Sequence, residues 1–343
     1  MTTQKFNYGV PKEWLPNPED ERLHTPTGDE SLPWKDTWYF SLRDDASDQT
    51  LNVHMTISAN RTPPTRVGVS VAHGAKFITE VMRNEGNNTG NSFGNSLAHI
   101  DVVHLSGDSD HELLMVGNLE AVSFELTVKG KHYAPLWDTM FPAYYATGKF
   151  GHQYSHYEQL VTATGWVQWK GGERVPFSGI GWRDRGWGRR KTELTFNTGI
   201  DLIGAILPDD SVFSVVAIRS NEVPPEDPMP IAGWRSAEGV LVPAVGGLYY
   251  KDAMAWPNRI ELEFLDGYSF KAHTVRRSAG LAAAWHDAEP EQSGYGHNLR
   301  DYYAVMADEA GREFTVFSNH GNIHKVNVFL DAEFKYIQPP EGG

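Results

Sequence analysis

Two short stretches near the middle of the chain hold most of the side chains that could do chemistry. The first, from Gly151 to Gln159, is GHQYSHYEQ, and the second, from Gly179 to Arg190, is GIGWRDRGWGRR. Histidine and glutamate can carry protons. Arginine offers a fixed fork of hydrogen-bond donors, and tryptophan offers a flat apolar wall. Together these residue types suit a site that holds a polar group beside an apolar molecule.

In the first stretch, alternation along a strand would place His152, Tyr154, His156 and Glu158 on one face. Two histidines and a glutamate resemble a set of metal ligands, but no motif of known ligand spacing accompanies them, so we expect no metal. We predict that His156 or Glu158 carries a proton as a catalytic residue. The alternative is that both make structural polar contacts between strands.

In the second stretch, Asp184 lies between Arg183 and Arg185. Nearby cations favour the charged carboxylate, so Asp184 is poorly suited to act as a general acid. We predict that Asp184 and Arg183 organise the catalytic site and leave the proton to the first stretch. The substrate-binding residues are predicted to be Trp182, Trp187, Tyr154, Tyr157 and Arg185. The alternative is a tight turn held by arginine–tryptophan stacking and an ion pair of Asp184.

The composition excludes several classes of protein. The 343 residues include no cysteine, which excludes disulfides, thiolate metal sites and a cysteine nucleophile. Thirty Lys and Arg against 44 Asp and Glu give a net charge of −14, which disfavours binding to nucleic acid or to anionic lipid. The sequence contains no phosphate-binding loop and no dinucleotide-binding motif, so we expect no cofactor.

The N-terminal residues MTTQKFNYGVPKEW lack the apolar region of a signal peptide, and no stretch approaches the roughly 18 apolar residues of a membrane span. The absence of cysteine also fits a reducing compartment. We therefore predict a cytoplasmic protein with no membrane span, whose partner is a hydrophobic small molecule. The oligomeric state stays open.

The elements that must position these residues are predicted to be strands. The sequence has 11 Trp, 14 Tyr and 16 Phe, which favour strands, together with 33 Gly and 20 Pro, which favour turns. Apolar residues alternate with polar or small ones, and Asp266-Gly267 is typical of a hairpin turn. One short helix is predicted from Ser278 to Asp287. The alternating runs are 51–59, 67–71, 122–128, 260–264, 268–274 and 326–336.

Such alternation means that each strand has one buried face and one polar face, as in antiparallel sheets. The predicted fold class is therefore all-β, and many antiparallel strands over this length favour barrels or sandwiches. The length favours two domains. We place them at residues 1–190 and 191–343.

Three stretches carry a resemblance to a known family. They are Pro33 to Phe40 (PWKDTWYF), His156 to Gln159 with Gly165 after it, and Gly181 to Arg190 (GWRDRGWGRR). Together they resemble the bacterial carotenoid 1,2-hydratase-like proteins, a two-lipocalin-domain superfamily that includes hydroxyneurosporene synthase. Tocopherol cyclase and the fungal lipocalin-type Diels–Alderases are more distant relatives. The resemblance spans most of the chain.

The resemblance implies two lipocalin-like antiparallel β-barrel domains packed side by side. It also implies a cofactor-independent lyase or isomerase, either a hydratase, a dehydratase or a cyclase, that acts by proton transfer on a terpenoid or another hydrophobic unsaturated molecule. The alternative is a non-catalytic lipocalin-like carrier of a hydrophobic ligand. The family commonly has His-Ser where this chain has Arg185 and Gly186, so a proton carried by that histidine in relatives would need another carrier here.

Overall fold

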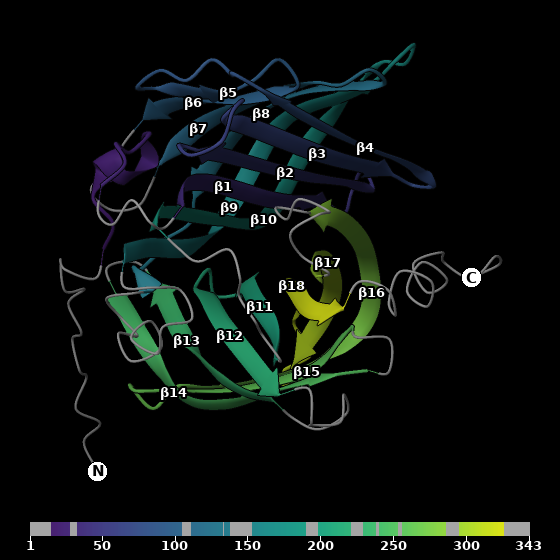
Figure 1. Cartoon of the computed structure of the whole chain (residues 1–343). Coiled ribbons are helices and arrows are strands. Elements are labelled where there is room, and N and C mark those ends of the chain that lie inside the picture. The colour runs from purple at the N-terminus through teal and green to yellow at the C-terminus, as the bar shows by residue number, and fades with distance from the viewer. Residues whose placement is uncertain are drawn as a thin grey trace. The chain divides into compact units, whose positions relative to one another are not determined.

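A computed structural model of the chain is built almost entirely of antiparallel strands (Figure 1). It describes residues 15–27, 33–104, 111–132, 134–137, 153–189, 198–220, 229–237, 240–252, 256–285 and 295–325. The first compact unit contains residues 9–194 and 236–240, and the second contains residues 1–8, 195–235 and 241–343. The domain boundary predicted at residue 190 stays a prediction, because residues 190–197 lie outside the described part.

The first unit contains a ten-stranded antiparallel sheet with the order β4-β3-β2-β1-β10-β9-β8-β7-β6-β5. A short 3₁₀ helix, η2 (Pro18–Glu21), precedes the sheet in the chain. The strands are β1 (Trp34–Asp44), β2 (Gln49–Ser58), β3 (Thr65–His73), β4 (Lys76–Asn84), β5 (Ser92–Gly94), β6 (Ala98–His104), β7 (Glu112–Asn118), β8 (Val122–Gly130), β9 (Gln153–Trp169) and β10 (Arg174–Arg189).

One face of this sheet forms an apolar core, and we call it the core face. The predicted alternating runs on β2, β3 and β8 supply buried side chains to it, among them Val53, Val69 and Phe124. Trp38 on β1 stacks on Phe93 of β5 with ring centroids 4.0 Å apart, although the two strands are far apart in the order of the sheet. The sheet is therefore strongly curved around its core.

The curved sheet is a half-barrel, and it is consistent with the lipocalin-like domain predicted for this part of the chain. Among the described residues no ladder joins β4 to β5, so these two strands are the edges of the sheet. The edge strand β4 carries Phe77 and Val81, two large apolar residues that are 54% and 50% exposed.

The second unit is a closed barrel of strands β11 to β18. Inside the described part of this unit, the Lys251 ammonium lies 2.9 Å from the carboxylate of Asp201, and both side chains are buried. The predicted run 326–336 lies outside the described residues. The strands are β11 (Thr198–Ile206), β12 (Val212–Ser220), β13 (Met229–Ala237), β14 (Val240–Lys251), β15 (Pro257–Phe264), β16 (Ser269–Trp285), β17 (Tyr295–Asp308) and β18 (Glu313–Lys325).

Strand β16 confirms one prediction and corrects another. The hairpin predicted at Asp266-Gly267 is present, since β15 pairs with β16 across this turn. The helix predicted from Ser278 to Asp287 is wrong, because β16 continues through Trp285 and pairs with β17. Alanine has a high helix propensity, but propensity is weak and is overridden by the ladder that closes the barrel.

Each membrane-spanning helix must be both long and apolar, and no helix in the described part of the chain meets that requirement.

Candidate functional site

Strands β9 and β10 carry all nine residues predicted for the site, and the pairing of these strands decides which residues meet. In the antiparallel register, Glu158 lies opposite Asp184, and Tyr157 lies opposite Arg185. Residues that face each other across two paired strands point to the same side of the sheet. The nine residues therefore divide between its two faces.

Trp38 of the apolar core pairs with Arg185, which identifies the core face. The predicted residues on this face are Tyr157, Arg183, Arg185 and Trp187. Those on the opposite face are Tyr154, His156, Glu158, Trp182 and Asp184.

The predicted shared face of Tyr154, His156 and Glu158 is thus confirmed, while His152 lies outside the described residues. Arg183 and Asp184 were predicted to organise one site together. They are neighbours on an extended strand, and they therefore point to opposite faces.

His156, Glu158 and Asp184 form what we call the carboxylate–histidine cluster. The Nε2 atom of His156 lies 3.4 Å from Glu158 Oε1 and 3.4 Å from Asp184 Oδ1. The side chain of Glu158 is fully buried, whereas that of Asp184 is 27% exposed. In the described residues no group of His, Asp and Glu is arranged to hold a metal ion. The imidazole of His156 thus lies between a buried carboxylate and a partly exposed one, an arrangement that suits the uptake and delivery of a proton.

Two aromatic rings lie beside the imidazole of His156. The indole of Trp137 and the phenol of Tyr154 have ring centroids 6.2 Å and 6.3 Å from it, with interplanar angles of 27° and 22°. Trp137 was not predicted, because it lies outside both motif stretches and no motif marks it. Trp182 packs edge-on against Tyr39 at 5.8 Å. Aromatic faces of this kind stabilise cations without reacting with them.

Gly186 leaves the space that the Tyr154 ring occupies, since a Cβ at this position would overlap the Tyr154 hydroxyl. The Thr37 hydroxyl donates a hydrogen bond to the Gly186 carbonyl at 3.0 Å, and it lies 3.5 Å from the Tyr154 hydroxyl. Because the single hydroxyl proton of Thr37 points at Gly186, Tyr154 is the donor in the second contact. Thr37 and Gly186 therefore position Tyr154 next to the cluster.

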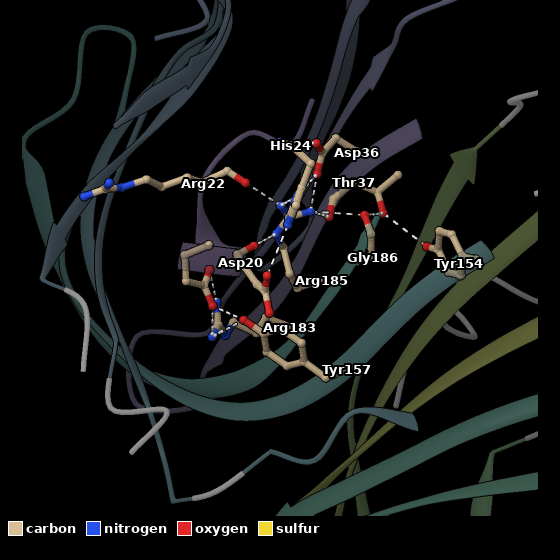
Figure 2. A network of polar contacts seen from close by, with 11 residues as sticks. Asp20, Arg22, His24, Asp36, Thr37, Tyr154, Tyr157, Arg183, Arg185 and Gly186 are labelled. Atoms are coloured by element: carbon tan, nitrogen blue, oxygen red, sulfur yellow. Dashed lines mark hydrogen bonds and ion pairs between the residues drawn. The ribbon is translucent and has the colours of Figure 1, made fainter. Parts of the chain in front are cut away.

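The core face carries a buried polar network that ties η2 to the sheet (Figure 2). The guanidinium of Arg183 donates to both carboxylate oxygens of Glu21, at 2.8 Å and 2.7 Å. It also donates to Gln159 Oε1 at 2.8 Å and to the Tyr157 hydroxyl at 3.1 Å. Tyr157 in turn donates to Glu21.

Arg185 is the second centre of this network. Its Nη1 atom lies 2.6 Å from Asp36 Oδ1, and other guanidinium atoms donate to the carbonyls of Asp20 and Arg22 at 2.9 Å and 2.8 Å. The guanidinium lies 4.0 Å from the centroid of the Trp38 ring. Arg185 therefore fixes the chain around η2 against the core.

The charges of the network set the pKa values of its acids. Burial raises the pKa of Glu21, but the charges of Arg183, His111 and Arg185 and the hydrogen bond from Arg183 together hold this pKa below its usual value. Burial likewise raises the pKa of Asp36, but the charge of Arg185 and the hydrogen bonds and charge of His24 together hold it below its usual value. Both carboxylates therefore stay ionised at neutral pH and serve as structural anchors.

Sequence reasoning also missed His24, whose ring lies parallel to Trp187 with centroids 4.6 Å apart and an interplanar angle of 4°. Its Nδ1 and Nε2 atoms lie 3.3 Å from Asp36 Oδ1 and from Asp20 Oδ1. Burial lowers the pKa of His24, but hydrogen bonds to Asp20 and Asp36 raise it above its usual value. No motif marks His24, because its partner strands β1 and β10 are brought to it by the fold.

The structure explains residues 185 and 186, the two positions at which the chain departs from the family that it resembles in sequence. Arg185 points into the core face and is held by Asp36, and an arginine does not give up a proton in proteins. Gly186 leaves room for Tyr154. The two positions therefore fix the strands and one aromatic ring, and the titratable ring nearest to them on the opposite face is His156.

Fold and site together define an all-β protein of two lipocalin-like units, one of which carries a carboxylate–histidine cluster on its sheet. The chain belongs to the family described as a domain of unknown function, DUF7064, which matches residues 17–247.

The crystal structures that are similar to this chain include the following two. One is of a protein from Nitrosomonas europaea described as a putative AttH, with 12% sequence identity and a TM-score of 0.56 over 91% of this chain and 98% of that one. The other is of CghA with Sch210972, with 12% identity and a TM-score of 0.52 over 85% of this chain and 88% of that one. No curated protein sequence matches this chain. At such low identities the similarity shows the fold alone, and it confirms the predicted lipocalin-like architecture.

Proposed function

We propose that this protein is a cofactor-independent lyase or isomerase, either a hydratase, a dehydratase or a cyclase, that transfers protons to and from a hydrophobic unsaturated small molecule. The observation that carries the proposal is the position of His156, whose Nε2 atom lies 3.4 Å from each of two carboxylates. The fold shared with CghA, whose crystal structure contains Sch210972, adds support that a protein of this architecture binds a small organic molecule.

In this proposal His156 is the acid. The imidazolium gives its proton to one carbon of a C=C bond, so that a carbocation forms on the other carbon. Water or a second double bond of the substrate then supplies the electron pair that closes the new bond. A proton leaves the product and returns to His156, so that no cofactor is consumed.

The other members of the cluster have distinct roles. Glu158 is buried and orients the imidazole, while Asp184 is partly exposed and exchanges protons with water. The faces of Trp137 and Tyr154 lie where they can stabilise the cation. Arg183 and Arg185 hold the strands from the core face, so we propose supporting roles for them and for Tyr157 and Trp187.

The test is the incorporation of solvent deuterium into carbon. The purified protein is incubated in D₂O with acyclic terpenes from geraniol to squalene, and products are analysed by mass spectrometry. Replacing His156 with Gln is expected to lower incorporation by about 10²-fold or more, and Glu158→Gln to lower it by a smaller factor. His99→Gln, which changes a half-exposed histidine of β6, is the matched control.

An unchanged rate in His156→Gln would remove this assignment. If mass spectrometry of the purified protein instead finds a bound hydrophobic molecule that gains no deuterium, the protein is a carrier.

A further inference from the structure

The Nδ1 atom of His24 has two partners that it can satisfy only one at a time. It lies 3.1 Å from Arg185 Nη2 and 3.3 Å from Asp36 Oδ1. A guanidinium only donates hydrogen bonds, and a carboxylate only accepts them. Neutral His24 with a bare Nδ1 therefore accepts from Arg185, whereas protonated His24 donates to Asp36. In both states Nε2–H faces Asp20, at 3.3 Å.

Protonation of His24 also changes what Arg185 can hold. Arg185 Nη1 lies 2.6 Å from the same Asp36 oxygen that protonated His24 would approach. The imidazolium therefore competes with the guanidinium for one oxygen, and it brings a second positive charge beside it. Arg185 therefore loses the Nδ1 atom of His24 as an acceptor and shares the Oδ1 atom of Asp36 with the imidazolium.

Arg185 is connected through the sheet to the opposite face. Its Nη1 atom donates to the carbonyls of Thr37 and Gly186 at 3.3 Å and 3.1 Å, and these two residues are paired across β1 and β10. The Gly186 carbonyl also accepts the Thr37 hydroxyl, which lies against the hydroxyl of Tyr154. Figure 2 shows this continuous path from His24 to Tyr154.

We propose that the protonation state of His24 regulates the carboxylate–histidine cluster, with Arg185 as the positioning residue that transmits it to Tyr154. The regulatory part rests on the proposed function, since it needs the cluster to be the reacting site. When His24 is neutral, Arg185 is held by both Asp36 and His24, and Tyr154 is fixed beside His156. When His24 is protonated, Arg185 is held less tightly, and Tyr154 shifts.

The groups around His24 determine the direction in which its pKa is shifted. Asp20 of η2, Asp36 of β1 and Arg185 of β10 face its ring, and the indole of Trp187 covers one side. Burial and the Arg185 charge lower its pKa, while the two carboxylates raise it above the usual value of 6.5. The switch therefore operates above the usual pKa of histidine.

The experiment follows Tyr154 directly and needs no substrate. The full-length protein is labelled with ring-¹³C tyrosine and ¹³C histidine, and the Tyr154 signal is assigned with Tyr154→Phe. Spectra are recorded against pH in a His156→Gln background, which removes the titrating ring nearest to Tyr154. We expect the Tyr154 signal to shift with the same midpoint as the His24 signal.

Two variants decide the outcome. His24→Gln keeps a hydrogen-bonding side chain that does not titrate, and it should abolish the pH-dependent shift of Tyr154. His99→Gln should leave the shift intact. A Tyr154 signal that does not change through the titration of His24, or a shift that survives in His24→Gln, overturns the proposal.

Activity separates this proposal from the proposed function. If deuterium incorporation depends on His156, its pH profile should show an additional limb that rises through the His24 midpoint and that His24→Gln removes. If the Tyr154 shift follows His24 but no variant of the cluster alters turnover, the coupling holds and the proposed function fails.

Discussion

At the scale of single residues, the Tyr154 ring fills the space that a side chain at Gly186 would need, and this gives a prediction. Replacing Gly186 with Ala puts a Cβ into the Tyr154 hydroxyl. Overpacking a well-packed site costs about 1–3 kcal/mol, so we expect a lower free energy of unfolding in urea together with a displaced Tyr154 ring. Gly90→Ala is the matched control, because a Cβ there meets nothing within 4 Å.

Combining Gly186→Ala with Tyr154→Phe removes the overlapping hydroxyl and should recover part of the loss. If Gly186→Ala is as stable as Gly90→Ala, the space at residue 186 does not constrain Tyr154.

The buried pair of Arg183 and Glu21 gives the second prediction at this scale. Arg183→Met leaves the Glu21 carboxylate buried without its main counter-charge, which typically costs about 3–5 kcal/mol. Adding Glu21→Gln removes the stranded charge, so the double variant should be more stable than Arg183→Met alone. Urea unfolding measures both.

The control for this pair is Arg277→Met, which removes the partner of Asp252 at a largely exposed site, and exposed pairs contribute about 0–1 kcal/mol. Equal losses in Arg183→Met and Arg277→Met would mean that the core-face network does not anchor η2.

At the scale of elements, the attachment of η2 to β1 and β10 predicts a dependence of stability on pH. Glu21 and Asp36 have pKa values below their usual 4.5 and 3.8. Such groups stabilise the fold above their usual pKa, and this contribution is lost as the pH falls through the folded-state pKa. We expect the free energy of unfolding to drop below about pH 4, and Asp36→Asn to flatten part of that drop.

His24 gives the opposite sign. Its pKa is raised above 6.5, so its contribution is present below that value and is lost as the pH rises through the folded-state pKa. Urea unfolding from pH 3 to pH 9 should therefore show a loss of stability at the acid end and another at the alkaline end. His24→Gln should remove only the alkaline loss. An alkaline limb that persists in His24→Gln would contradict the assignment.

The elements themselves could largely be predicted from the sequence. Period-two alternation located β2, β3 and β8 and the hairpin of β15 and β16, because a strand with one buried face has that pattern. The segment from Ser278 was mistaken for a helix, since alanines carry little pattern and only the β17 ladder decides their conformation. The sequence alone does not show whether the first sheet closes on itself, because edge pairing depends on the whole sheet.

The candidate site could be predicted only in part. The shared face of His156 and Glu158 followed from alternation within one strand, and Asp184 joins them because of the register between β9 and β10. Arg183 and Asp184 were predicted to organise one site, whereas adjacent residues on a strand point to opposite faces. Glu21 and its partner are 162 positions apart, and no local pattern reveals such a pair.

At the scale of the whole molecule, a net charge of −14 predicts which partners the protein avoids. A polyanion repels a polyanion, and affinity for a phosphate backbone requires a basic surface. We expect no binding to duplex DNA in gel-shift experiments and none to phosphatidylserine vesicles in sedimentation, both at about 0.15 M salt, where the Debye length is about 8 Å. Retention of either partner would reveal a local basic surface.

The difference between the two sheets has a consequence for how this family can diversify. In a closed barrel the number, tilt and stagger of the strands depend on one another, so one inserted strand would disturb every ladder. The half-barrel ends at β4 and β5, and a strand added at either edge would leave the existing ladders unchanged. Insertions and deletions during evolution should therefore gather at those edges, while the β1–β10–β9 pairing under the carboxylate–histidine cluster keeps its register.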